Sequence, residues 1–440
     1  MNCFRPCLMH TIQKNIYTPH SIKYSPQGHT LASIYVDGTI HICDTHTGEV
    51  KYVLKKGESK FEKDGDKSLN MFRQMVGRIK EVFIDDTNSM EYAPNGRTMA
   101  VCGSEANICL YDTETGDLKH ILQGDNFFLQ LVPFTYSPDS RMFAYISRDA
   151  AIHILDVETG DINIFQDHND IVFSMTYAPD SRTLAYSVSN AIHLLDIETR
   201  DIKIHYVSEP VLSMTYSPDG HTLAYTCDDN LYLLNVDDTD RLELYGIENN
   251  TVASLVYSPD GRTIASTSCE KICLINVEDQ RSMVHRIHIY NGSLIAYSPD
   301  SSTFAYVSDK MVYLVDVETG DVIHTLKHNA KVHSIAYSPD GYTLSTASRD
   351  RKVNIWALNE DTYRLHQLLK GEERLVAEEL TILDDKELRD VHESLWDAGS
   401  MRGDLYNEPL LAMDRCLGKR YSEAIGELDY AESISILLEA

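Results

Sequence analysis

Tyr216-Ser-Pro-Asp-Gly220 is the clearest copy of a five-residue motif that occurs eight times in the chain and decides its fold. Proline presets the first central position of a type I turn, Asp or Asn tolerates the second, and Gly or Ser takes the position that often needs a positive φ. Each copy is therefore predicted to join two antiparallel strands. The other copies begin at Tyr24, Tyr92, Tyr136, Tyr177, Tyr257, Tyr297 and Tyr337.

These motifs recur with a period near forty residues. From Tyr92 onward, consecutive motif tyrosines are 44, 41, 39, 41, 40 and 40 residues apart. A large apolar residue two positions before each tyrosine marks a first strand, and second, third and fourth strands follow within the same period. A second turn, such as Asp156-Val-Glu-Thr-Gly160, precedes the fourth strand. This pattern predicts an all-β fold, an eight-bladed β-propeller of four-stranded antiparallel blades, over residues 1–358.

The last repeat resembles a WD repeat. It has His328 before the first strand, Thr346 on the second, Asp350 in the following link and Trp356 at the end of the third. In that family these four side chains form a buried hydrogen-bonded network, so the resemblance implies the same network in repeat eight. The other repeats depart from it, because at the tryptophan position they carry Cys43, Tyr111, Leu155, Leu195, Leu234, Ile275 and Val315. The resemblance supports the propeller fold and says little about function.

Two stretches interrupt the period. An insertion of about residues 57–80 in repeat two places Leu69, Phe72, Val76 and Ile79 at helical spacing on one face. Residues 55–81 hold eight Lys or Arg against five Asp or Glu, so the insertion is locally basic. From residue 359 onward the motif stops, and residues 359–440 are predicted to form an acidic α-helical extension with 20 acidic and nine basic residues. These helices are expected to pack on the propeller, on one another or on a partner.

Composition limits the range of functions. The formal charge of −28 argues against nucleic acid and against an anionic membrane surface as general partners, because both require a basic footprint. There is no secretory signal and no apolar run long enough to span a membrane, so we expect an intracellular protein, first in the cytoplasm and alternatively in the nucleus. The nine cysteines lack metal-ligand spacing, and we interpret them as reduced thiols, several of them in the core.

No catalytic constellation is visible, and no cofactor or metal is expected. The sequence lacks a Gly-rich phosphate loop, a His-Glu-x-x-His metal motif and a Gly-x-Ser-x-Gly nucleophile turn. In a propeller of this type both recurring turns lie on one rim, here called the turn rim. The links before the first strand and after the second lie on the other, here called the link rim. Apart from the insertion residues, the candidate partner-binding residues are Phe127, Phe128, Arg148, Arg349 and Arg351 on the link rim. Burial under a loop is the alternative for the two phenylalanines, and a solvated link is the alternative for the arginines.

Two functional hypotheses follow. The first is a non-enzymatic scaffold or adaptor that docks protein partners through rim loops, the insertion or the C-terminal helices. The second is a propeller enzyme or small-molecule-binding propeller with a site in the central channel, as occurs in unrelated proteins of the same architecture. A narrower possibility is that the C-terminal helices oligomerise the chain.

The two ends of the repeat array are predicted to meet. Residues 9–12, Met-His-Thr-Ile, match residues 323–326, Ile-His-Thr-Leu, which form the fourth strand before the last repeat. The N-terminal segment is therefore predicted to supply the outer strand of the blade whose inner strands come from repeat eight. Residues 363–369 are the alternative segment for that position. Closure in this way removes an open sheet edge.

Overall fold

The computed structural model describes residues 5–13, 16–55, 89–102, 107–123, 133–147, 151–165, 171–227, 230–237, 242–245, 254–267, 271–279, 282–286 and 295–359. The chain divides into two compact units, one spanning His10–Trp356 and the other combining Met1–Met9 with Ala357–Ala440. Every regular element in the described residues is a β-strand. The insertion at 57–80 and the helices expected beyond residue 359 lie outside the described residues.

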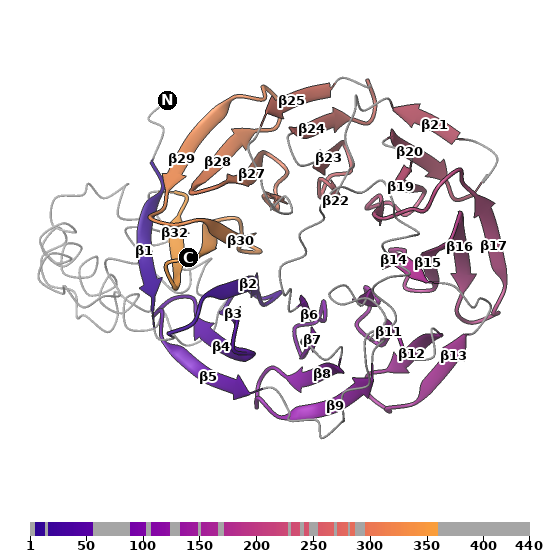
Figure 1. The fold of residues 1–440 in the computed structure, drawn as a ribbon, viewed down its shortest axis with the longest axis horizontal. Coiled ribbons are helices and arrows are strands. Elements are labelled where there is room, and N and C mark those ends of the chain that lie inside the picture. The colour runs from indigo at the N-terminus through magenta and orange to yellow at the C-terminus, as the bar shows by residue number, and fades with distance from the viewer. Residues whose placement is uncertain are drawn as a thin grey trace, which may run out of the picture. The chain divides into compact units, whose positions relative to one another are not determined.

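Eight four-stranded antiparallel sheets form the propeller predicted from the motif period (Figure 1). Blade one contains β2 (Pro19–Tyr24), β3 (Thr30–Tyr35), β4 (Thr39–Asp44) and β5 (Val50–Lys55). Blade two contains β6 (Ser89–Tyr92), β7 (Thr98–Cys102), β8 (Asn107–Asp112) and β9 (Leu118–Gln123). Blade three contains β10 (Phe134–Tyr136), β11 (Met142–Ile146), β12 (Ile152–Asp156) and β13 (Ile162–Phe165). Blade four contains β14 (Val172–Tyr177), β15 (Thr183–Val188), β16 (Ala191–Asp196) and β17 (Ile202–Tyr206).

The second half of the ring repeats this arrangement. Blade five contains β18 (Met214–Tyr216), β19 (Thr222–Cys227), β20 (Asn230–Asn235) and β21 (Leu242–Tyr245). Blade six contains β22 (Ser254–Tyr257), β23 (Thr263–Thr267), β24 (Lys271–Asn276) and β25 (Ser282–Arg286). Blade seven contains β26 (Ile295–Tyr297), β27 (Thr303–Ser308), β28 (Met311–Asp316) and β29 (Val322–Lys327). Blade eight contains β30 (Val332–Tyr337), β31 (Thr343–Ser348), β32 (Lys352–Ala357) and, as its outer strand, β1 (Cys7–Ile12).

The position of β1 confirms the predicted closure by the N-terminal segment. The strand order of blade eight is β1-β32-β31-β30, so its outer strand comes from the opposite end of the described chain. The Thr11 hydroxyl donates to the Asn354 side-chain oxygen at 2.9 Å, and Ile12 is buried. The first and last repeats are thus held in one sheet.

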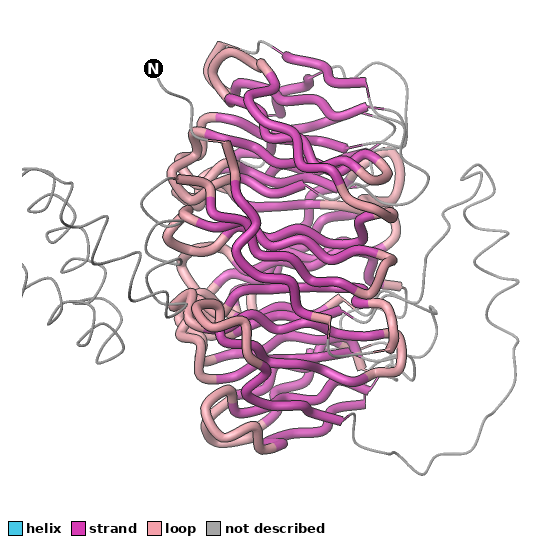
Figure 2. Tube along the Cα trace, turned by 90° about the vertical axis from the view of Figure 1, so that its left-hand side faces the viewer, coloured by secondary structure: helices cyan, strands magenta, loops and turns pink. Residues whose placement is uncertain are grey.

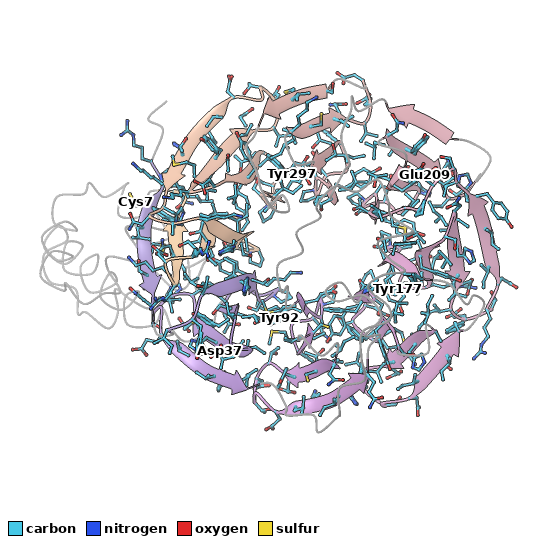
Figure 3. All side chains as sticks on the ribbon, viewed as in Figure 1. Cys7, Asp37, Tyr92, Tyr177, Glu209 and Tyr297 are labelled. Atoms are coloured by element: carbon cyan, nitrogen blue, oxygen red, sulfur yellow. The ribbon has the colours of Figure 1, made fainter. Side chains whose placement is uncertain are left out.

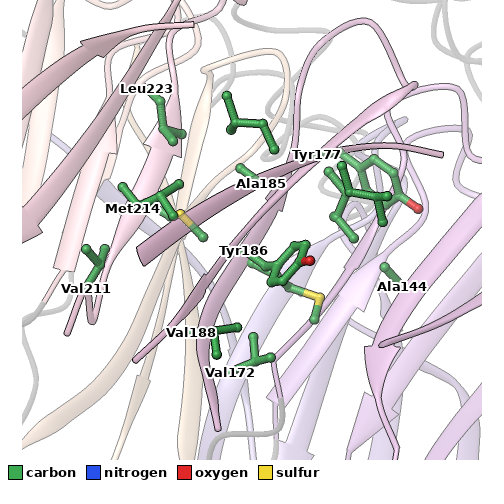
Figure 4. Close-up of a cluster of buried hydrophobic side chains, with 14 of the residues drawn as sticks. Ala144, Val172, Tyr177, Ala185, Tyr186, Val188, Val211, Met214 and Leu223 are labelled. Atoms are coloured by element: carbon green, nitrogen blue, oxygen red, sulfur yellow. The ribbon is translucent and has the colours of Figure 1, made fainter. Parts of the chain in front are cut away.

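The hydrophobic core lies between the stacked blades. Tyr186 of β15 is fully buried in one cluster that extends from blade three to blade five, with Val172, Val211 and Leu223 (Figure 4). The side view shows the strands running between two faces, each of which carries loops (Figure 2). Because each sheet packs against a neighbour on both sides, its strands are apolar on both faces rather than strictly alternating. This arrangement leaves the loops of the two rims as the variable surfaces.

Candidate interaction surfaces

The turn rim is built from motif turns that satisfy their own polar groups. In blade five, the Ser217 hydroxyl donates to the Asp219 carboxylate at 2.5 Å and accepts the Thr222 amide at 3.0 Å. This bond to Ser217 lowers the pKa of Asp219. Gly220 has φ of 78° and Ser140, at the same position in blade three, has φ of 66°, as the predicted turn geometry requires. The same serine–aspartate bond recurs at Ser137, Ser258, Ser298 and Ser338.

Neighbouring motif turns also contact one another around the ring. Where the fifth residue is serine, its hydroxyl accepts a backbone amide of the preceding turn, as Ser181 does from Asp139 at 3.0 Å. Where it is glycine, the position packs on the preceding turn, on its proline at Gly28, Gly220, Gly261 and Gly341 and on Gln27 at Gly96; a Cβ added at Gly220 would lie 3.3 Å from Pro179 Cδ. The cost of a positive φ at serine is thus offset by a hydrogen bond between blades.

The first aspartate of the second recurring turn forms ion pairs on this rim. Asp196 accepts the Glu198 and Thr199 amides and pairs with the Arg182 guanidinium at 2.7 Å. The hydrogen bond from Arg182, followed by that from the Thr199 amide, lowers the pKa of Asp196 to about 2. Three further pairs are Lys51–Asp44, Lys119–Asp112 and Arg141–Asp156. Backbone bonds such as Ile197 N to Arg182 O place both recurring turns on one rim, as predicted.

The motif tyrosines lie at the inner edge of the ring, where Figure 3 labels Tyr92, Tyr177 and Tyr297. The Tyr297 and Tyr337 hydroxyls reach the threonine that begins the second strand of the preceding blade, each at 3.0 Å. Tyr24 makes the equivalent contact to Thr343 at 2.8 Å and also accepts from Ser345 at 2.6 Å. The junction between blades eight and one therefore uses the same contact as the junctions between blades six and seven and between blades seven and eight.

One ionisable pair lies on the innermost strands. Glu91 of β6 and Lys23 of β2 are the only acidic residue and the only Lys or Arg in the eight first strands. Burial raises the pKa of the half-buried Glu91 carboxyl, whereas Lys23, the Tyr136 amide and the Thr135 hydroxyl act in the opposite direction. Among the described residues, no group of three or more His, Cys, Asp or Glu side chains could hold a metal ion. Glu91 is therefore the one acidic side chain of the described first strands on which an enzymatic hypothesis can rest.

The link rim of blades seven and eight brings three loops together. The Arg349 amide donates to the Lys331 carbonyl at 2.8 Å, and the His328 amide donates to the Lys310 carbonyl at 2.9 Å. Arg351 has φ of 68° and its amide donates to the Ser348 carbonyl at 3.1 Å. Lys310, Arg349 and Arg351 are exposed, and Lys331 is half-buried. Lys51, Lys119, Arg141 and Arg182 of the turn rim are paired, whereas none of these four forms an ion pair with another residue that the structure describes.

The structure thus places two of the predicted partner-binding residues, Arg349 and Arg351, on one hairpin between β31 and β32. The other candidates lie outside the described residues: Leu69, Phe72, Val76, Ile79, Phe127, Phe128 and Arg148. Lys310 and Lys331 were not among the predicted residues, although Lys331 is bonded to the Arg349 hairpin and Lys310 to the loop at His328. Lys310 follows a second strand and Lys331 precedes a first strand. Their positions in the repeat therefore already placed both residues on the link rim.

The WD-type side chains of blade eight make some of the contacts that the resemblance implies. The Trp356 indole donates to the Thr346 hydroxyl at 3.0 Å, and the His328 ring lies edge-on to Trp356 at 5.6 Å between centroids. Burial lowers the pKa of His328, and the Asp350 charge opposes that shift. Asp350 accepts from the Ser348 hydroxyl at 2.5 Å. Asp350 thus caps its own hairpin.

Other blades use a different polar pair between their second and third strands. In blade four, Tyr186 and His193 face each other in register, and the Tyr186 hydroxyl lies 3.1 Å from His193 Nδ1. Blade three has Tyr145 and His153 at the same positions. Blades five and seven stack two tyrosines there, as Tyr225–Tyr232 and Tyr306–Tyr313. Blades without the tryptophan thus join their second and third strands by a tyrosine–histidine contact or by stacked tyrosine rings.

The geometry defines the class of protein as a β-propeller. Residues 320–357 match the family model "WD domain, G-beta repeat". The matched repeat lies in blade eight, and together with the ring of eight four-stranded blades it supports a β-propeller of the WD-repeat family. No curated protein sequence matches the chain.

Among solved structures, the computationally designed Ika8 protein is similar, with a TM-score of 0.59 and 11% identity over 80% of this chain and 99% of that one. This likeness concerns the fold alone. Among the residues that the structure describes, there is no helix with the length and apolarity needed to cross a bilayer.

Proposed function

We propose that this protein is a non-enzymatic scaffold that docks protein partners through its link-rim loops, with the 57–80 insertion and the C-terminal region as further docking elements. WD-repeat propellers are generally interaction scaffolds, which supports the coarser part of this proposal. The observation that carries it is the contrast between the rims. Turn-rim side chains bond one another, whereas the cations of the link rim in blades seven and eight are exposed or half-buried without a described ion-pair partner.

Proximity labelling in cells tests this proposal. The full chain is compared with a deletion of residues 57–78, a chain ending at residue 359, and the Lys331→Glu/Arg349→Glu double variant. Arg97→Glu/Arg262→Glu on the turn rim is the matched control, because it changes the net charge by the same amount. We expect at least one of the first three changes to remove specific neighbours that the control retains. An identical set of neighbours for all five proteins would overturn the proposal.

The alternative, an enzymatic or small-molecule site in the channel, rests on the Glu91 carboxyl beside Lys23. It predicts a metabolite that raises the Tm of the protein and loses this effect in Glu91→Gln. The scaffold proposal predicts that no compound of a metabolite library behaves in this way.

A further inference from the structure

The link rim of blades seven, eight and one combines positive charge with exposed apolar side chains. The positive part consists of Lys310, Lys331, Arg349 and Arg351. The apolar part lies on blade one, where the Val36 amide donates to the Thr18 carbonyl at 3.1 Å. Beside these two residues, Ile16 is 72% exposed, Tyr17 is 44% exposed, and Val36 itself is 50% exposed. We refer to this combined surface as the basic–apolar patch.

Contacts between inner strands hold the two parts next to each other. The rings of His20 in β2 and His333 in β30 are 5.7 Å apart, close to the link-rim ends of these strands. The Ile22 amide donates to the Ser334 hydroxyl at 3.1 Å across the same junction. Blades eight and one are therefore adjacent, and a short extended segment lying on the link rim can reach both parts.

The acidic groups nearby do not neutralise the patch. Within the three cationic loops the acidic residues are Asp309 and Asp350, and Asp350 accepts a hydrogen bond from Ser348. The nearest acidic residue on blade one, Asp37, accepts from the Thr39 amide and hydroxyl. Four cations therefore face three carboxylates, of which two are engaged in their own turns. The excess is positive on a chain whose formal charge is −28.

The charge of the opposite rim decides what kind of anion fits. A six-residue strand such as β30 spans about 20 Å, which is more than twice the Debye length of roughly 8 Å at physiological ionic strength. A short ligand on the link rim is therefore screened from the acidic turn rim. A long polyanion or a charged bilayer would also meet the acidic remainder of the protein. Neither ligand offers an apolar side chain to pack on the exposed Ile16, Tyr17 and Val36.

We propose that the basic–apolar patch binds an acidic polypeptide segment that carries an apolar side chain beside its carboxylates. This inference rests on the proposed scaffold function and names the chemistry of the partner. Lys331 and Arg349, which are joined through their backbones, bind the carboxylates. Arg351 and Lys310 flank them. The apolar side chain packs on Val36 and Tyr17. Arginine suits this role because its planar guanidinium accepts a carboxylate in a bidentate arrangement.

Fluorescence anisotropy with the full chain tests the inference. The probe is a labelled synthetic peptide of Asp and Glu residues with one central Phe, and its partners are the same peptide with Ala for Phe and a neutral Asn/Gln version. We expect the Phe peptide to bind most tightly, with an affinity that falls as salt is added. Lys331→Glu/Arg349→Glu is expected to weaken binding at least about tenfold, whereas Arg97→Glu/Arg262→Glu on the turn rim changes it much less. Val36→Ser is expected to weaken the Phe peptide and leave the Ala peptide unchanged.

Several outcomes would overturn the inference. The first is an absence of peptide binding at low salt. The second is an equal loss of peptide affinity in the two double variants. The third is tighter binding of single-stranded DNA or of anionic phosphatidylserine vesicles, if the link-rim variant abolishes that binding too. The milder Arg349→Gln/Arg351→Gln variant repeats the test if charge reversal lowers the Tm. If the peptide fails while proximity labelling still loses neighbours, only this inference falls. If labelling is also unaffected, the proposed function falls with it.

Discussion

The turn rim and the link rim of this propeller use their polar groups differently. On the turn rim, Ser217 bonds Asp219, Arg182 pairs with Asp196, and each motif turn contacts the next. On the link rim of blades seven and eight, backbone bonds join the loops, and Arg349 and Arg351 are exposed. The difference teaches that a repeated loop serves the scaffold, whereas a loop that departs from the repeat is available for recognition.

Opening the ring should give the largest effect, because it disrupts the scaffold that carries both rims. Deletion of residues 1–14 removes the buried side chains Met9 and Ile12 and exposes the edge of β32. We expect a loss of about 3–6 kcal/mol in the free energy of unfolding, measured by denaturant titration. Leu8→Ser, at an exposed position of the same strand, is the control. An unchanged stability would mean that another segment, such as residues 363–369, supplies the outer strand.

Loss of the tyrosine contact at the closing junction should come next. Tyr24→Phe removes the hydroxyl that bonds Thr343 and Ser345 in a buried site. Because the buried Ser345 and the half-buried Thr343 lose a partner, we expect destabilisation by about 2 kcal/mol, read from the shift in the denaturant midpoint. Tyr206→Phe removes a hydroxyl from a side chain that is 79% exposed, and it should leave the midpoint unchanged. Equal midpoints for the two variants would refute a role for this contact in closure.

The tryptophan contact of blade eight lies within the sheet that carries the Arg349 hairpin. Thr346→Val keeps the shape of the side chain but removes the acceptor of the Trp356 indole. Since Trp356 is half-buried, we expect a cost of about 1 kcal/mol together with a change in tryptophan fluorescence. Thr325→Val on the exposed outer strand β29 is the matched control. No change in either measurement would show that the bond contributes nothing to the blade.

The pH dependence of stability should reveal the ion pair of Asp196 on the turn rim. The folded-state pKa of Asp196 is about 2, below its ordinary value of 3.8, so its stabilising contribution is complete above pH 3.8 and is lost as the pH falls through 2. Asp196→Asn should therefore lower the Tm at neutral pH slightly and reduce the fall in Tm across this acid range. Asp201→Asn removes a nearby charge and is the control. Parallel Tm profiles for wild type and Asp196→Asn would contradict a stabilising role of the Asp196 carboxylate.

The smallest effect on stability is expected on the link rim. Arg349→Glu changes an exposed side chain that pairs with no described residue, so the free energy of unfolding should change by less than about 0.5 kcal/mol. Thermal melts of this variant and of wild type provide the measurement. A large loss of stability would mean that the hairpin belongs to the scaffold, and the contrast between the rims would then fail.

Much of the fold follows from local features of the sequence. The motif fixes eight turns, because proline, aspartate and a residue at positive φ are sufficient to define each one. The match between residues 9–12 and 323–326 also identified the outer strand of blade eight. The pairing of Tyr186 with His193 was not predicted from the sequence. The partner of His193 depends on the register between two strands, which alternation alone does not specify.

The sequence by itself therefore determined the number of blades and the position of both recurring turns, and it predicted the N-terminal segment as the closing strand with residues 363–369 as the alternative. Each of these depends on residues that are neighbours in the chain or on an exact internal repeat. Only the tertiary structure decided which charges gather on the link rim. Lys310, Lys331 and Arg349 stand about twenty residues apart in three separate links, and they meet because adjacent blades stack around one axis and backbone bonds join the links. Spatial proximity of this kind arises from the closure of the ring, and no local pattern encodes it.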